Sequence, residues 1–213
     1  MQKIIRTIAV LIVTLGFAAS AQAVIVTVNM TGDNIIDGGG LCDDATCMDG
    51  TGWTGLGLDS SSNNLANWTQ SDSVMLDLGA GTHYFAWHVA NSGSPTSGNP
   101  AALLAEILWG GNANYSSSSW EIYDISDGSG IGSATEYGNN GGANIWTTVN
   151  GGPVSGISGN ANWIYTENNY ANADSSAWIR TSITIASVPE PGALALVGLG
   201  LVGVAFGRRR RSA

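Results

Sequence analysis

The sequence has 213 residues, with 16 acidic and 7 basic side chains and a formal net charge of -9. Six of the basic residues are Lys3, Arg6 and Arg208 to Arg211 at the two ends, so residues 24–188 hold 15 acidic side chains against Arg180 alone, a net charge of -14. This charge excludes nucleic acid as a partner, because phosphates are neutralised by clustered Lys and Arg, and the composition is unlike that of collagen, a coiled coil or a polytopic membrane protein.

Residues 1–23 have the three parts of a secretory signal peptide. Lys3 and Arg6 precede an apolar run at 8–17, which is too short to span a membrane, and the segment ends in Ala21-Gln22-Ala23. Cleavage after Ala23 makes Val24 the first residue of the mature protein. We therefore expect export through the Sec translocon.

The exported part, residues 24–187, is predicted to be a single all-β domain. Short apolar and aromatic runs alternate with Gly, Ser and Asn, which favour turns, and this pattern is typical of an antiparallel β-sandwich or jelly roll. Residues 103–109 fit either a strand or a buried helix. The predicted strands are 24–30, 73–78, 82–89, 120–125, 144–149, 161–166 and 177–186.

The segments between these strands are predicted to be loops, long enough to form binding edges. Residues 161–166 and 177–185 are faintly similar to paired strands of galactose-binding-like sandwiches, and no ligand position of that fold is carried over. The predicted loops are 59–64, 91–100, 110–119, 126–143 and 150–160.

An acidic segment follows the first predicted strand and contains the turn-forming run 38–40 of three glycines. Carboxylates at close spacing can hold calcium, although the spacing does not match an EF-hand loop. A solvated acidic loop is the alternative, because the whole body is acidic. The candidate ligands are Asp33, Asp37, Asp43, Asp44 and Asp49.

The same segment contains the only cysteines, Cys42 and Cys47. An even cysteine count in an exported chain predicts a disulfide, and this one would close a short loop and stabilise the fold modestly. A zinc site would need further His or Cys ligands nearby, and the sequence has none there.

All eight tryptophans lie in the body. Trp87, Trp120, Trp163 and Trp178 lie inside predicted strands and are expected in the core. Trp53 and Trp68 have loop-like surroundings and are the candidate platforms for stacking on sugar rings.

No enzyme motif is present in the body. His83 and His88 are five residues apart in a predicted strand and therefore on opposite faces, and no nucleophile elbow or H-E-x-x-H pattern occurs. A glycoside hydrolase needs two suitably spaced carboxylates, and the sequence selects no pair among Glu106, Glu121, Glu136 and Glu167. We expect Arg180 to pair with one carboxylate across the sheet.

The C-terminal segment 188–213 combines three elements in a fixed order. Val188 precedes Pro189-Glu190-Pro191, an uncharged run at 193–207 predicts a short transmembrane helix, and the chain ends in an arginine cluster (Arg208, Arg209, Arg210 and Arg211). The prolines keep the segment before the helix extended.

This C-terminal pattern resembles the PEP-CTERM sorting signal of Gram-negative bacteria. The resemblance implies recognition by an exosortase-type transpeptidase, which cuts near the tripeptide after transient anchoring in the inner membrane with the body in the periplasm. It also implies a host that makes exopolysaccharide.

The sequence thus predicts an exported, non-enzymatic cell-surface or extracellular-matrix protein without a cofactor, associated with exopolysaccharide. The alternatives are a carbohydrate-binding module that uses loop aromatics and calcium, and a secreted glycan hydrolase.

Overall fold

The computed structural model describes residues 23–42, 53–55, 67–124, 130–167, 169, 173–187 and 197–201. Its contacts divide the chain into a body, Val24–Ile185, and a second unit made of Met1–Ala23 and Ala186–Ala213. Nearly all of the predicted signal peptide, including Ala21, lies outside the described residues.

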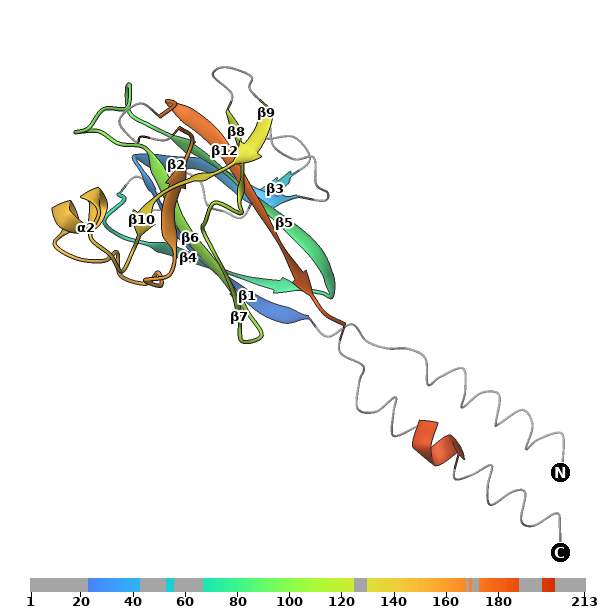
Figure 1. The fold of residues 1–213 in the computed structure, drawn as a ribbon. Coiled ribbons are helices and arrows are strands. Elements are labelled where there is room, and N and C mark those ends of the chain that lie inside the picture. Colours follow the sequence, from blue (N-terminus) through green and yellow to red (C-terminus); the bar gives the residue numbers. More distant parts are fainter. Residues whose placement is uncertain are drawn as a thin grey trace, which may run out of the picture. The chain divides into compact units, whose positions relative to one another are not determined.

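The body contains two antiparallel sheets (Figure 1). In the first, sheet A, the strand order is β10-β11-β6-β1-β4, and β7 pairs with β6 beside β11. Its strands are β1 (Val24–Asp33), β4 (Asp72–Leu78), β6 (Ala102–Trp109), β7 (Asn112–Tyr115), β10 (Thr135–Asn139) and β11 (Asn162–Tyr165).

The second sheet, sheet B, has the order β3-β2-β5-β12-β8-β9. Together the sheets confirm the predicted all-β sandwich. The strands of sheet B are β2 (Ile35–Cys42), β3 (Trp53–Gly55), β5 (Gly81–Ala90), β8 (Glu121–Asp124), β9 (Gly130–Ser133) and β12 (Ser176–Ile185).

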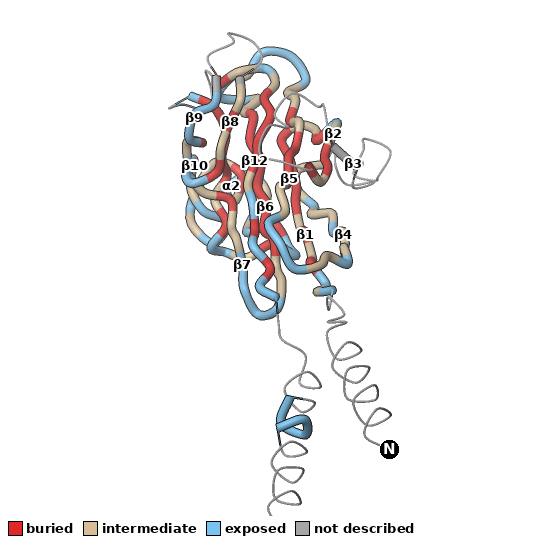
Figure 2. Tube along the Cα trace, turned by 90° about the vertical axis from the view of Figure 1, so that its right-hand side faces the viewer, coloured by how far each residue is buried: buried red, intermediate tan, exposed pale blue. Residues whose placement is uncertain are grey.

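The core lies between the two sheets, where buried residues follow the central strands (Figure 2). Val26, Val28 and Met30 of β1 are fully buried, and so are alternate residues of β5. This spacing of two places one face of each strand in the core. Trp87 of β5 donates from Nε1 to Met30 Sδ at 3.1 Å, which connects the two sheets.

Trp87 is also the centre of an aromatic stack between Phe85 and Trp120, with ring centroids 6.2 and 5.3 Å away. The run of glycines at 38–40 belongs to β2 and not to a turn, so that expectation was wrong. Gly39 pairs with Trp87, and a Cβ there would lie 3.2 Å from Trp87 Cδ1. The indole thus fills the space that a side chain on β2 would need.

The ambiguous segment around 103–109 is a strand, β6, which is buried on both faces over its first half. One face packs in the sandwich core. On the other, Glu106 accepts hydrogen bonds from Asn29 Nδ2 at 2.8 Å and from Ser158 N at 3.1 Å, so the segment around residue 158 covers this part of sheet A.

Residues 144–149 do not form the predicted strand; Ile145–Asn150 is a short helix, α2. Asn144 and Thr147 form a capping box, and Gly151 ends the helix at a φ of 74°. These caps satisfy the free backbone groups of the helix ends and outweigh the strand preference of the β-branched residues in it.

Two predicted loops contain strands. Segment 110–119 includes β7, which forms a hairpin with β6 through Gly110 and Gly111, both with positive φ. Segment 126–143 includes β9 and β10. These strands are short and polar, and they form because β6, β8 and β11 offer backbone partners.

In the second unit, residues 197–201 are helical. They are part of the predicted transmembrane helix at 193–207, whose other residues lie outside the described part of the chain. Among the residues described, no helix is long and apolar enough to cross a membrane.

Candidate functional site

A cavity of about 280 Å³ lies where β1 ends and α2 begins. Its wall combines two indoles, a carboxylate, amides and aliphatic side chains from separate parts of the sequence. It is lined by Asp33, Asn34, Trp68, Ser97, Gly98, Asn99, Pro100, Ile145, Trp146 and Val149. We call it the Trp68 pocket.

Trp68 is held by a tight turn at residues 67–70. Asn67 Oδ1 accepts from Thr69 N at 3.2 Å and from Thr69 Oγ1 at 2.7 Å, a local pattern that fixes the turn. The Trp68 ring meets Trp163 edge-on, with centroids 6.3 Å apart and an interplanar angle of 75°. The half-buried indole thus has a defined orientation in the pocket wall.

Trp68 is the first of a row of four aromatic rings, which we call the aromatic ladder: Trp68, Trp163, Trp146 and Tyr137. Trp163 stacks on Trp146 of α2 at 4.6 Å, and Trp146 stacks on Tyr137 of β10 at 6.0 Å. Trp146 and Trp163 are almost completely buried, whereas Trp68 is partly exposed. Of these rings, Trp68 and Trp146 line the pocket, and Trp68 is the more exposed of the two.

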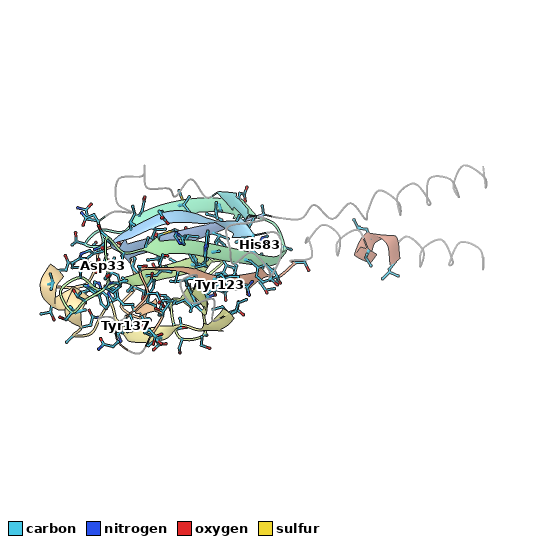
Figure 3. All side chains as sticks on the ribbon, turned by 90° about the horizontal axis from the view of Figure 1, so that it is seen from above. Asp33, His83, Tyr123 and Tyr137 are labelled. Atoms are coloured by element: carbon cyan, nitrogen blue, oxygen red, sulfur yellow. The ribbon has the colours of Figure 1, made fainter. Side chains whose placement is uncertain are left out.

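Asp33, the last residue of β1, is buried in the wall of the pocket. Its Oδ2 accepts from Trp146 Nε1 at 2.8 Å, and its Oδ1 accepts from Asn34 Nδ2 at 2.7 Å. Burial raises the pKa of this carboxyl to about 6, although both hydrogen bonds lower the pKa. Asp33 lies at the α2 end of the body, and His83 lies at the other end of the sandwich (Figure 3).

Amides form the polar side of the pocket. Asn34 Oδ1 accepts from Ser92 N at 2.7 Å, and Asn99 Nδ2 donates to Ser92 O at 3.2 Å. Asn91 donates to Asn99 O at 3.1 Å. These bonds anchor the segment 91–100, one of the loops that the sequence proposed as a binding edge.

The pocket can therefore offer an apolar ring face and several hydrogen-bonding groups to one small ligand. Carbohydrate sites use this combination, because sugar rings stack on aromatic faces through their C–H groups and bond through their hydroxyls. Asp33, which has the one carboxylate among the described lining residues, accepts two hydrogen bonds from protein groups.

The structure brings Trp68 and Asp33 together, although the sequence assigned them to different sites. Asp37 lies elsewhere, as it accepts from His88 Nδ1 on sheet B. Within the described residues, no group of three or more His, Cys, Asp or Glu could hold a metal ion. Asp43, Asp44, Asp49 and the Trp53 side chain lie outside those residues, so calcium binding stays a prediction.

The predicted disulfide is also only partly covered. Cys42 is buried at the end of β2, beside Ala86 and Trp178. Cys47 lies outside the described residues, so the Cys42–Cys47 bond stays a prediction.

The remaining candidates are dispersed. His83 bonds to Gly79 O at 2.8 Å, far along β5 from the His88–Asp37 pair. Glu136 accepts from Ser118 N at 2.7 Å, and Arg180 pairs with Glu121 directly across β12 and β8, as predicted. Among the described residues, the lining of the Trp68 pocket includes no glutamate, and a second cavity of the body is lined by Glu121 alone of the four candidate glutamates.

Sequence reasoning missed Asn34, Asn99 and Trp146 as pocket residues. A capping signal was present for α2, because Asn144 and Thr147 have capping-box spacing and Gly151 follows the helix. No local signal places Trp146 beside Asp33, because 113 residues separate them.

The comparisons with known proteins identify one part of the chain. No curated protein and no solved structure matches the sequence. Residues 187–211 match a family model described as the PEP-CTERM protein-sorting motif. The chain therefore carries a PEP-CTERM sorting motif, which implies an exported protein that exosortase-type machinery sorts through its C-terminal signal.

Proposed function

We propose that the body is a cell-surface or extracellular-matrix protein that associates with exopolysaccharide, has no catalytic role and holds a glycan in the Trp68 pocket. The observation that carries the proposal is the oriented, partly exposed Trp68 ring beside the amides of Asn34 and Asn99. The PEP-CTERM motif supports it, because the motif implies export to where such a polymer would be met.

The arrangement of carboxylates favours binding over hydrolysis. Glycoside hydrolases need two carboxylates at either side of the scissile bond. Among the described residues that line the Trp68 pocket, Asp33 is the only one with a carboxylate, so this lining lacks the second carboxylate that hydrolysis needs. The pocket is thus suited to holding a sugar and not to cleaving a glycosidic bond.

A pull-down on a panel of polysaccharides tests the proposal. Trp68→Ala should weaken binding about tenfold, the effect of losing one stacking contact. Trp109→Ala is the matched control, because Trp109 is also partly buried and lines neither cavity. Absence of glycan binding by the wild type, or equal loss in both variants, would refute the proposal.

Two further arms separate the alternatives. Trp53→Ala tests the second predicted platform, and a chelator tests calcium, since binding that disappears with chelator would assign a role to the acidic segment. Release of soluble sugar from the same polysaccharides would support the hydrolase alternative.

The sorting step has its own test. Replacing Pro189-Glu190-Pro191 with alanines should block C-terminal processing and retain the protein in the membrane fraction, as read by mass spectrometry and fractionation. Unchanged processing in that variant would contradict the role of the motif.

A further inference from the structure

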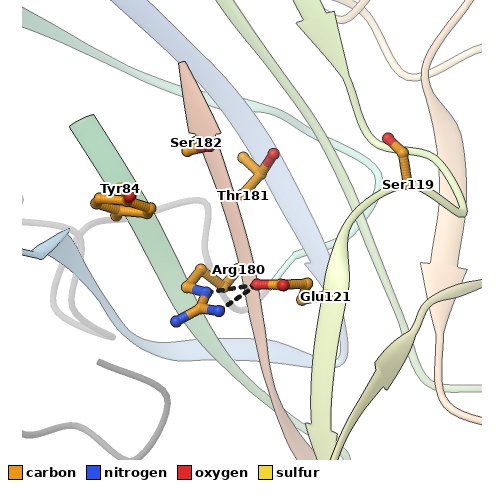
Figure 4. A pocket seen from close by; sticks show the side chains of 6 residues that line it. All are labelled: Tyr84, Ser119, Glu121, Arg180, Thr181 and Ser182. Atoms are coloured by element: carbon orange, nitrogen blue, oxygen red, sulfur yellow. Dashed lines mark hydrogen bonds and ion pairs between the residues drawn. The ribbon is translucent and has the colours of Figure 1, made fainter. Parts of the chain in front are cut away.

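A second cavity, of about 220 Å³, belongs to sheet B and shares no residue with the Trp68 pocket. The pairing of β12 with β8 ends at Arg180 and Glu121. The cavity lies just beyond that pair, beside Ser119, which precedes β8, and residues 181 and 182 of β12. It is lined by Tyr84, Ser119, Glu121, Arg180, Thr181 and Ser182 (Figure 4). We call it the Glu121 cavity.

Arg180 holds the Glu121 carboxylate from below the surface. Arg180 Nε donates to Glu121 Oε2 at 2.7 Å, and Nη2 donates to the same oxygen (Figure 4). The Arg180 side chain is 7% exposed and that of Glu121 is 47% exposed. The carboxylate is therefore the more accessible member of the pair for a ligand.

This pair is poorly explained as a device for stability. Arg180 Nη1 is buried and has no hydrogen-bond partner in the described part of the chain. Burying a charge costs hydration free energy, which an incompletely bonded pair does not recover. Placing the single cation of residues 24–188 there does orient one exposed carboxylate beside a cavity.

Hydroxyl groups complete the wall. Ser119 and Ser182 are exposed and Tyr84 is half-buried. Each hydroxyl can donate or accept, and an ionised carboxylate accepts only. A cavity with one fixed acceptor and adaptable hydroxyls is complementary to a ligand that presents several hydroxyls of its own.

The negative charge of the body favours a neutral sugar over an anionic one. Glu121 neutralises Arg180, and the remaining residues of the segment 24–188 are uncharged or acidic, so an anionic sugar would approach a repulsive field. A neutral sugar avoids this repulsion, and its hydroxyls donate to the carboxylate in charge-assisted hydrogen bonds.

We propose that the Glu121 cavity is a second glycan site, which binds a neutral, hydroxyl-rich sugar through the Glu121 carboxylate with Arg180 as its positioning residue. In taking a glycan as ligand, the inference rests on the proposed function. It adds a site on the other sheet, whose described lining residues are all polar or charged and include no tryptophan.

The test follows Arg180 by NMR. The full chain, labelled with ¹⁵N-arginine and kept in detergent, contains six arginines, and Arg180→Lys identifies the Arg180 Nε–H signal by removing it. Methyl β-glucoside and methyl β-galactoside are the neutral probes, and glucuronate is the anionic one. The neutral glycosides should shift the Arg180 signal saturably, because hydroxyls on Glu121 change its bond to Arg180.

Ser182→Tyr should abolish this shift by filling the cavity. Thr184→Tyr is the matched control, because Thr184 is exposed on the same strand and does not line the cavity. Circular dichroism checks that both variants fold. A shift that persists in Ser182→Tyr, a larger response to glucuronate, or no response to either glycoside would overturn the inference.

The result is separable from that of the proposed function. Polysaccharide binding that depends on Trp68, without any Arg180 shift, would retain the proposed function and refute the Glu121 site. An Arg180 shift without binding that depends on Trp68 would retain the Glu121 site and refute the role of the Trp68 pocket.

Discussion

The aromatic ladder on sheet A and the Arg180–Glu121 pair on sheet B are both buried features next to a cavity, but burial has opposite consequences for them. Trp146 and Trp163 remove large apolar surfaces from water, which favours folding. Arg180 loses the hydration of a full charge, which opposes folding. Among the described residues, a buried nitrogen without a hydrogen-bond partner is common to both regions, Nε1 of Trp163 in the ladder and Nη1 of Arg180 in the pair, so the contrast is between a charged and a neutral group. The ladder should therefore stabilise the body, whereas the ion pair should chiefly orient a carboxylate.

Removing the centre of the ladder should have the largest effect on stability. Trp163 is fully buried and contacts both Trp146 and Trp68. Trp163→Ala should lower the free energy of unfolding by about 3 to 5 kcal/mol, measured by urea denaturation. Trp68→Ala, at the partly exposed end, should cost about 1 to 2 kcal/mol. If Trp68→Ala lost as much free energy of unfolding as Trp163→Ala, the distinction between a core residue, Trp163, and a partly exposed residue, Trp68, would be contradicted.

The carboxyl of Asp33, bonded to the ladder, should give a pH dependence of intermediate size. Its pKa is raised from 3.8 to about 6 by burial, so the folded state binds the proton more tightly than the unfolded state. The stabilisation of the folded state by the protonated Asp33 carboxyl is complete below about pH 4 and is lost as the pH rises through about 6. The free energy of unfolding changes by up to about 3 kcal/mol over this range.

Asp33→Asn removes this titration and keeps an oxygen for Trp146 Nε1. The free energy of unfolding of the variant minus that of the wild type should therefore increase between about pH 4 and about pH 7. A difference that stays constant, or falls, over that range would show that Asp33 does not titrate in this way.

The smallest effect is expected on replacing Arg180 of the ion pair with an uncharged side chain. Arg180→Met removes the buried charge and keeps an unbranched side chain, so stability should stay within about 1 kcal/mol of the wild type. Glu121→Gln leaves the buried cation without its counter-charge and should cost more, about 1 to 3 kcal/mol. Chemical denaturation measures the free energy of unfolding of both variants. If Arg180→Met lost as much of it as Trp163→Ala, the ion pair would stabilise the body as strongly as the ladder, and the comparison would fail.

Much of the fold was predictable because its signals are local. Alternation along residues 24–30 and 82–89 reflects strands with one buried face, and β1 and β5 have that form. The expectation failed for residues 144–149, where helix caps outweigh β-branched residues, and for β7, β9 and β10. These short strands depend on partners distant in the sequence, so their own residues carry little signal.

The candidate sites were less predictable, and the reason is distance along the chain. Trp68, a candidate platform for sugar rings, lines a cavity, and its contact with a glycan stays a prediction. Arg180 pairs with a carboxylate as expected. Neither Glu121 as that carboxylate nor Asn99 as a neighbour of Trp68 could be inferred, because strand register and loop packing decide them.

Two kinds of property can now be separated for this protein. The sequence alone determines the charge distribution, the alternation within strands and the sorting motif at 187–211. Each of these depends on residues that are neighbours in sequence, because sorting signals are recognised as short segments and strand faces follow from alternate residues. The hydrogen bond between the buried Asp33 and Trp146, the contact of the partly exposed Trp68 with Trp163, and the carboxylate held by Arg180 arise only when strand register and the packing of α2 and the loops bring residues distant in sequence into contact.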